Sequence, residues 1–297
     1  MFKGVGTALI TPFNEDFSVD YVSLKRLVEF QLKSNVDALI VLATTGEAPT
    51  IEINEFEEIV SFVMNEVNGK VPVIVGTGTN NPKKVLKLNK IAESLKVDGL
   101  LIVNPYYNKS TQNGLVEYYK YISEHTILPI ILYNVPSRTG MNITPQTIVK
   151  IHSLCPNVIG VKEASGNISQ IAELMAIKPD SLNVFSGNDD QTLPIMTLGG
   201  CGVISVVSNI LPSEFRELTH LILKERISEA QTINNKLLKI ANLLFVETNP
   251  IPVKYAAYKL GLCKNYLRLP LIQASKNTEN LIDEELSKLG ALWWLKQ

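Results

Sequence analysis

The sequence has little cysteine and no excess of charge of either sign. Three cysteines, Cys155, Cys201 and Cys263, are spread over 297 residues without a Cys-x-x-Cys pair. This pattern predicts reduced thiols in a cytoplasmic protein. Lysine and arginine number 28 against 29 aspartates and glutamates, so the net charge of -1 gives no electrostatic reason to expect nucleic acid or a membrane surface as a partner.

Long apolar runs are also absent. No segment approaches the roughly 18 apolar residues of a membrane-spanning helix. The N-terminal segment is broken by glycines and has no long apolar centre, so we do not expect a signal peptide. Because 45% of the residues are hydrophobic, the chain can still bury a large core.

Short apolar runs alternate with amphipathic segments through the first 225 residues. The predicted strands are 4–10, 38–42, 71–75, 98–103, 128–133, 157–162, 182–186 and 202–206. The predicted helices are 20–34, 52–67, 82–95, 112–124, 144–153, 167–176, 189–198 and 213–223. Eight such units predict an α/β fold of the (β/α)8 TIM barrel type. An open doubly wound sheet is the alternative, which the lack of an obvious switch point disfavours.

Beyond residue 225 the strand pattern stops. Helices are predicted at 227–245, 251–261 and 279–291, and no linker rich in glycine, proline or serine precedes them. We therefore predict a catalytic barrel over residues 1–225 and a C-terminal helical extension, packed on the barrel, over residues 226–297.

One predicted strand carries a lysine at its tip. Alternation places Val158, Gly160 and Lys162 on one face and the two residues between them on the other. The glycine below Lys162 leaves room for the lysine side chain to lie over the sheet. A lysine in a low-dielectric cavity can lose its proton, and the neutral amine can attack a carbonyl to form a Schiff base. The alternative is an ordinary solvated lysine at a strand end.

Other predicted strands also end in polar side chains, and a barrel of this kind places its chemistry there. Thr44 and Thr45 end the second strand, Tyr107 follows the fourth, and Tyr133 and Arg138 follow the fifth. A tyrosine can transfer a proton in a dry site, and the planar guanidinium of arginine suits a carboxylate. Turn, packing and surface roles are the simpler alternatives for these residues.

Metal ligands are missing from the predicted strand ends. His125, His152 and His220 fall on predicted helices or near their C-termini, whereas a metal-dependent aldolase needs histidines at the strand ends. Asp189 and Asp190 could bind a divalent ion, but their place at a helix N-terminus is explained by the helix dipole. We therefore expect no metal and no cofactor, and Schiff-base chemistry on a small keto acid.

Five motifs occur in order along nearly the whole chain. They are Thr-Thr-Gly-Glu at 44–47, Asn-Pro-Tyr-Tyr-Asn-Lys at 104–109, Tyr-Asn-Val-Pro-Ser-Arg-Thr-Gly at 133–140, Gly-Val-Lys-Glu-Ala-Ser-Gly at 160–166 and Asn-Pro-Ile-Pro-Val-Lys at 249–254. In these motifs the chain resembles the dihydrodipicolinate synthase branch of the pyruvate-dependent class I aldolase and lyase family. The resemblance implies a lyase that condenses pyruvate with L-aspartate 4-semialdehyde to give 4-hydroxy-tetrahydrodipicolinate. This is the first committed step of the diaminopimelate and lysine pathway.

The resemblance also implies roles for catalytic residues. Lys162 would form the imine with pyruvate, and Tyr133, Thr44 and Tyr107 would relay protons. Tyr107 would reach in from a neighbouring subunit, which fits the homotetramer, a dimer of dimers, that the resemblance implies.

Substrate-binding residues follow from the same resemblance. Thr45 and the main chain near Gly187 and Ile204 would help to hold pyruvate. Arg138 would bind the carboxylate of the aldehyde.

Two other functions stay open on the sequence. An N-acetylneuraminate or 2-keto-3-deoxy sugar acid lyase would share Lys162 and Tyr133, but such relatives typically lack the arginine at position 138. A ligand-sensing barrel that has lost catalysis is the alternative outside enzymology, and the filled strand ends disfavour it.

Inhibition by lysine is expected to be weak or absent. Lysine-inhibited members of the family bind the effector at a subunit interface through polar and acidic residues. The corresponding positions here are Ala48, Pro49, Ile53, Phe56, Asn80, Lys84 and Tyr106. Ile53 and Phe56 are apolar, and Lys84 would repel the ammonium group of free lysine.

Overall fold

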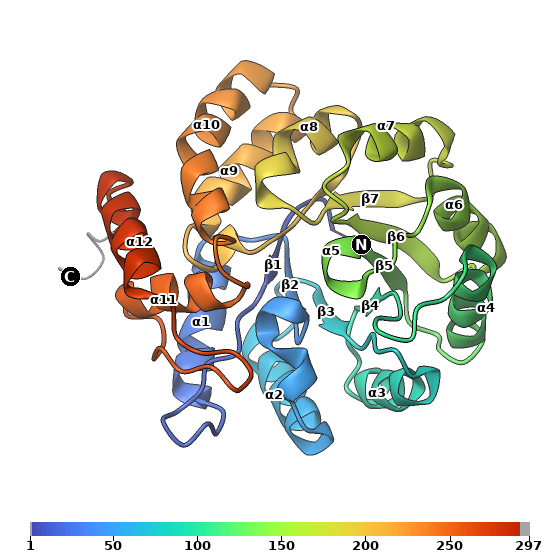
Figure 1. The fold of residues 1–297 in the computed structure, drawn as a ribbon, viewed down its shortest axis with the longest axis horizontal. Helices are drawn as coiled ribbons and strands as arrows, with labels where there is room; N and C mark the ends of the chain where they lie inside the picture. Colours follow the sequence, from blue (N-terminus) through green and yellow to red (C-terminus); the bar gives the residue numbers. More distant parts are fainter. Residues whose placement is uncertain (1, 292–297) are drawn as a thin grey trace.

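The computed structural model describes residues 2–291, which form a closed barrel of eight parallel strands inside a ring of helices (Figure 1). The strands are β1 (Gly4–Ala8), β2 (Ala38–Val41), β3 (Val73–Gly76), β4 (Gly99–Val103), β5 (Ile130–Asn134), β6 (Val158–Glu163), β7 (Asn183–Ser186) and β8 (Gly202–Ser205). Because β1 pairs with both β2 and β8, the sheet has no free edge. The predicted TIM barrel is confirmed.

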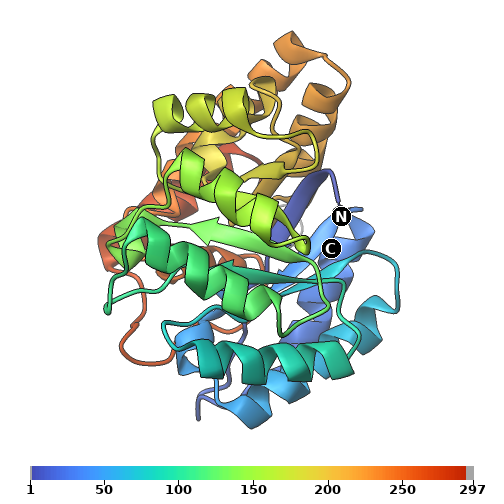
Figure 2. The same ribbon diagram turned by 90° about the vertical axis from the view of Figure 1, so that its right-hand side faces the viewer.

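Helices connect the strands and cover the outside of the barrel. They are α1 (Tyr21–Lys33), α2 (Ile53–Val67), α3 (Pro82–Ser94), α4 (Gln112–Ser123), α6 (Pro145–Leu154), α7 (Ile168–Ile177), α8 (Thr192–Thr197) and α9 (Pro212–Leu223). In Figure 2 the helices α3, α4, α6 and α7 follow one another along the outer face, with the strands behind them. The short helix α5 (Pro136–Thr139) instead lies over the barrel opening in Figure 1.

The hydrophobic core has two layers. A smaller cluster fills the inside of the barrel and includes Ile40, Ile131 and Phe185, all with no exposed surface. A larger cluster lies between the strands and the surrounding helices. Alternate residues of each strand therefore pack inward and outward, which is how the same strands support both layers.

Strand β6 departs from the simple alternation that we predicted. Its register against β5 shifts by one residue, so that Ile130 pairs with Val158 but Ile131 pairs with Gly160. Val158 consequently belongs to the outer hydrophobic cluster and does not share the inner face with Lys162. The prediction for Val158 was wrong because an irregularity in strand pairing moves every residue before it to the other face.

Three further helices follow the barrel within the described residues: α10 (Ile227–Leu243), α11 (Ile251–Lys259) and α12 (Lys276–Lys288). α10 packs against α9, and α11 packs against α12 (Figure 1). α12 begins three residues before the predicted start, because Ser275 caps it by accepting a hydrogen bond from the amide of Thr278. The division of the chain at residue 225 stays a prediction. Throughout residues 2–291, each helix is too short or too polar to cross a membrane.

Candidate active site

The carboxyl ends of the strands open into a cavity of about 690 Å³. Lys162 and Tyr133 both line it, and the two residues are register partners at the ends of β6 and β5. The Lys162 Nζ atom lies 4.4 Å from the centroid of the Tyr133 ring. Lys162 is 4% exposed, so its side chain is largely removed from water at the wall of the cavity. An amine in such a position can attack a carbonyl group to form an imine.

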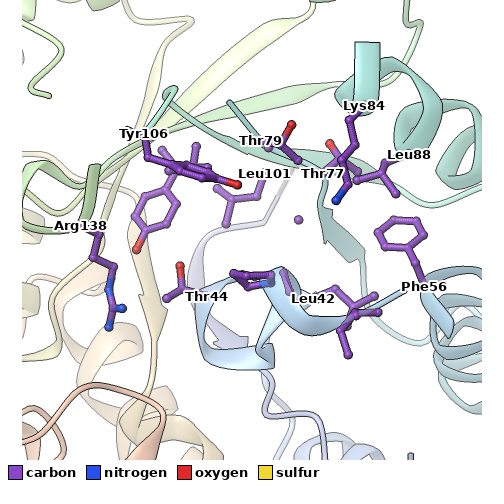
Figure 3. A pocket seen from close by; sticks show the side chains of 18 of the residues that line it. Leu42, Thr44, Phe56, Thr77, Thr79, Lys84, Leu88, Leu101, Tyr106 and Arg138 are labelled. Atoms are coloured by element: carbon purple, nitrogen blue, oxygen red, sulfur yellow. The ribbon is translucent and has the colours of Figure 1, made fainter. Parts of the chain in front are cut away.

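A second cavity of about 290 Å³ adjoins the first. Tyr133, Val135 and Arg138 line both cavities. Figure 3 places Arg138 and Thr44 at one end of this second cavity and Phe56, Lys84 and Leu88 at the other. The predicted proton-relay residue Thr44 therefore lies on the same continuous hollow as Tyr133.

The two threonines come from a tight turn after β2. Two short 3-10 helices, Thr44–Gly46 and Ala48–Thr50, meet at Glu47, whose φ of 56° is left-handed. Thr44 lines the smaller cavity and Thr45 the larger one. The Thr45 hydroxyl accepts a hydrogen bond of 3.0 Å from the side-chain amide of Asn249. The turn thus directs adjacent hydroxyls to the two hollows.

Arg138 lies on α5 at the rim. One guanidinium nitrogen donates to the backbone carbonyl of Asn249 at 3.0 Å. Arginine has five donors, so this bond leaves others for a carboxylate in the cavity. Asn249 therefore contacts both Thr45 and Arg138, a role that we did not predict although Asn249 begins one of the five motifs.

Gly187 and Ile204 lie at the ends of β7 and β8. Gly187 lines the larger cavity, and a Cβ atom there would come within 2.5 Å of the Ala164 side chain, so only glycine fits. Ile204 packs in the inner cluster with Tyr133. The structure brings Lys162, Tyr133, Thr45, Arg138 and Gly187 to one cavity.

Two predicted site residues, Ile204 and Tyr107, line neither cavity, and Tyr107 is also far more exposed. Its side chain is 92% exposed, and its backbone has a φ of 69°. Neither cavity described above is lined by Tyr107. A role in the site of a neighbouring subunit stays a prediction.

Asp189 lies at a helix N-terminus, as predicted, and also has a role that we did not predict. It lies in a 3-10 helix before α8 and is buried, and its carboxylate accepts hydrogen bonds from the amides of Val206 and Val207 at 2.9 and 3.1 Å. Burial raises the pKa of Asp189 to about 6. The aspartate thus holds the turn that follows β8, and sequence reasoning missed this because the partners are 17 residues or more away.

Glu163 is a second buried acid beside Lys162. It accepts hydrogen bonds from the Asn134 side chain at 3.0 Å and from the Ser165 amide at 2.8 Å. Burial raises the pKa of Glu163 despite these bonds. Within residues 2–291, no three histidine, cysteine, aspartate or glutamate side chains come together in a way that could hold a metal ion.

Known proteins match this chain over almost its full length. The model of the "Dihydrodipicolinate synthetase family" matches residues 1–289. The 4-hydroxy-tetrahydrodipicolinate synthase of Thermotoga neapolitana is 50% identical over 295 residues, covering 98% of this chain and 100% of the relative. The enzyme of that name from Clostridium tetani is 47% identical over 287 residues, covering 97% of each.

Solved structures agree with the sequence matches. A dihydrodipicolinate synthase from Thermotoga maritima superposes with a TM-score of 0.97 at 48% identity, covering 98% of this chain and 100% of the other. A structure described as the first monomeric dihydrodipicolinate synthase variant superposes with a TM-score of 0.96 at 48% identity, covering 98% of each chain.

Proposed function

The chain belongs to the dihydrodipicolinate synthetase family, and on that premise we propose that it condenses pyruvate with L-aspartate 4-semialdehyde. The product is 4-hydroxy-tetrahydrodipicolinate, the first committed intermediate of diaminopimelate and lysine synthesis. The observation that carries this proposal is the buried Lys162 amine, 4.4 Å from the centre of the Tyr133 ring, in a cavity that also presents Arg138.

Lys162 begins the reaction. Its neutral amine attacks the C2 carbonyl carbon of pyruvate, and the carbonyl oxygen leaves as water to form an imine. The imine withdraws electrons from the adjacent methyl group, which loses a proton to give an enamine. Tyr133, which lines both cavities, accepts or delivers this proton, and Thr44 extends the relay along the smaller cavity.

Carbon–carbon bond formation follows. The enamine carbon attacks the aldehyde carbon of aspartate 4-semialdehyde, and the aldehyde oxygen takes up a proton to become the hydroxyl of the product. Arg138 holds the carboxylate of this second substrate at the rim. The amino group of the substrate then attacks the imine carbon, which closes the ring and releases Lys162.

Pyruvate itself needs a binding site next to Lys162. We assign this to Thr45 and to the main chain near Gly187 and Ile204, where β2, β7 and β8 end. A carboxylate there would accept hydrogen bonds from a hydroxyl group and from backbone amides. These few donors must hold the carboxylate, because the net charge of the chain supplies no attraction for an anion.

We also propose that the protein is a homotetramer in the cytoplasm. Tyr107, exposed on its loop, completes the relay in the site of a neighbouring subunit of a homotetramer. The predicted extension runs over residues 226–297, of which 292–297 lie outside the described residues, and its described part packs as part of each subunit. All three cysteines are free and buried, which fits the reducing cytoplasm.

Mass spectrometry after treatment with pyruvate and borohydride tests the proposal. Wild type should retain a reduced pyruvate adduct on Lys162, and Lys162→Ala should retain none. Lys109→Ala, which removes an exposed lysine after β4, is the matched control and should keep the adduct. Wild type without an adduct would exclude Schiff-base catalysis.

The acceptor is tested separately. Purified enzyme should consume pyruvate only when aspartate 4-semialdehyde is added, and it should leave N-acetylneuraminate and 2-keto-3-deoxy sugar acids uncleaved. Cleavage of a sugar acid at a higher kcat/KM than the condensation would establish the lyase alternative.

A further inference from the structure

Two of the five sequence motifs meet in a buried ion pair. Glu47, in the turn after β2, accepts a bond of 2.6 Å from Lys254, on α11 in the C-terminal extension. Their side chains are 1% and 0% exposed, and 207 positions separate them in the sequence. We propose that Glu47 and Lys254 are positioning residues that fix the direction of Thr44 and Thr45, and this inference rests on the function proposed above.

Every polar side-chain atom of the pair forms a hydrogen bond, either with the other member of the pair or with a backbone group of the extension. The second oxygen of Glu47 accepts a bond of 3.0 Å from the amide of Arg268. Lys254 also donates to the carbonyl of Tyr266 at 2.7 Å, and its Nζ lies 4.0 Å from the centre of the Phe13 ring. The glutamate side chain is therefore anchored rather than free to change rotamer.

The backbone of Glu47 explains why this anchor matters. Glu47 and Leu42 have left-handed φ values of 56° and 54°, and the two threonines lie between them. A non-glycine residue in this region costs of order 1 kcal/mol or more and persists only where its surroundings hold it there. Because Glu47 is where the two 3-10 helices meet, its direction sets the direction of both threonine hydroxyls.

Stabilisation of the fold does not by itself explain why this ion pair is present. Burial lowers the pKa of Lys254 even though Glu47 opposes that change, which means that removal from water costs the charged amine heavily. A buried ion pair of this kind can often be replaced by apolar residues with little loss of stability. Apolar residues cannot, in contrast, replace the directional hydrogen bonds of the pair.

A second contact links the same segment of the extension to the site. Asn249, five positions before Lys254, donates to the Thr45 hydroxyl and accepts from Arg138. The segment 249–254 thus holds the threonine turn at Thr45 and at Glu47. Two attachment points prevent a rotation of the threonine turn that a single point would allow. Lys254 therefore acts on the reaction although its side chain lines neither cavity.

The double variant Glu47→Gln with Lys254→Met tests the proposal. It removes both charges together and keeps a glutamine oxygen for the Arg268 amide. Lys259→Met is the matched control, because Lys259 lies on the same helix but forms its ion pair, at 3.0 Å, with Asp283 of α12. Steady-state kinetics with both substrates, pyruvate trapping on Lys162 and thermal unfolding are measured for all three proteins.

We expect the double variant to unfold cooperatively and still to trap pyruvate, with kcat lowered about tenfold or more because Thr44 is displaced from the relay. The KM for pyruvate should rise through Thr45, while Lys259→Met keeps both constants. A folded double variant with wild-type kcat and KM would overturn the inference alone. Wild type that traps no pyruvate would overturn the proposed function and the inference with it.

A charge-conserving variant covers the case in which the double variant does not fold. Glu47→Asp keeps the negative charge, tolerates a left-handed backbone and withdraws the carboxylate by one methylene group. Loss of kcat in folded Glu47→Asp supports positioning, and wild-type kinetics in this variant refute it.

Discussion

Tyr133 and Lys162 face each other across the β5–β6 pair, with the lysine amine 4.4 Å from the centre of the tyrosine ring. Adjacent parallel strands fix this relationship, because their pairing register holds both backbones. The position of the proposed acid–base group, Tyr133, relative to the proposed nucleophile, Lys162, therefore depends on the paired strands of the barrel and not on a loop.

Tyr133→Phe should separate imine formation from proton transfer. The phenylalanine ring keeps the packing against Lys162, but the hydroxyl is lost. We expect kcat to fall by about 10²- to 10⁴-fold while the pyruvate adduct still forms. Tyr255→Phe is the control, since its hydroxyl bonds to Asp283 between α11 and α12, neither residue lines either cavity, and the change should not affect kcat. Unchanged kcat in Tyr133→Phe would remove the tyrosine from the relay.

Arg138→Leu should weaken use of the aldehyde and spare pyruvate. Loss of a charged hydrogen-bond donor to a carboxylate should lower kcat/KM for aspartate 4-semialdehyde by roughly 10- to 100-fold. Arg138→Lys should recover part of this loss, because the lysine ammonium keeps the positive charge but lacks the planar set of donors of the guanidinium group. Arg226→Leu removes an exposed arginine that pairs with Glu229 and should leave the kinetics unchanged. A larger effect on pyruvate than on the aldehyde would contradict this assignment.

Tyr107 should act on a site in another subunit. Mixing and refolding inactive Lys162→Ala with inactive Tyr107→Phe should restore up to about a quarter of wild-type activity, because half of the random dimers would contain one complete site of two. Each protein refolded alone is the control. Mixed protein that stays at the level of the separate variants would place Tyr107 outside a shared site.

Asp189→Asn should change how stability depends on pH. The folded pKa of Asp189 is about 6, above its ordinary 3.8, so its stabilising contribution is complete below about pH 3.8 and is lost as the pH rises through about 6. This contribution amounts to roughly 3 kcal/mol. Asparagine does not titrate and should not show this loss.

The measurement is the free energy of unfolding of wild type and Asp189→Asn at several pH values across this window. The difference between the two proteins isolates Asp189 from other acids, including Glu163. Curves that run parallel would show that Asp189 does not bind a proton in this range.

Free lysine should leave the enzyme active. Ile53, Phe56 and Lys84 line the 290 Å³ cavity, and Figure 3 shows Phe56 and Lys84 at the same end of it. Apolar walls and a positive charge disfavour a second ammonium group there. We expect an unchanged rate with sub-millimolar lysine at fixed concentrations of both substrates. Lys84→Glu, which reverses the charge, is the informative comparison, and inhibition of the wild type would show that the cavity accepts lysine.

Hydrophobic periodicity predicted the order and type of the barrel elements because it reports which face of each segment is buried. The strand containing Lys162 was predicted as 157–162 and observed as Val158–Glu163. Since a parallel barrel gathers the carboxyl ends of its strands, the sequence also indicated which polar residues would meet. The motifs then suggested the chemistry.

Only the tertiary structure decided the contacts between distant segments. The register shift in β6, the bonds of Asp189 to Val206 and Val207, and the pair of Glu47 with Lys254 have no local sequence pattern. Each contact joins segments that are far apart in the sequence. The distance between such segments is set by the packing of the whole molecule. The sequence by itself determined the barrel and indicated which side chains we propose to react, whereas the fold determined what holds them in place.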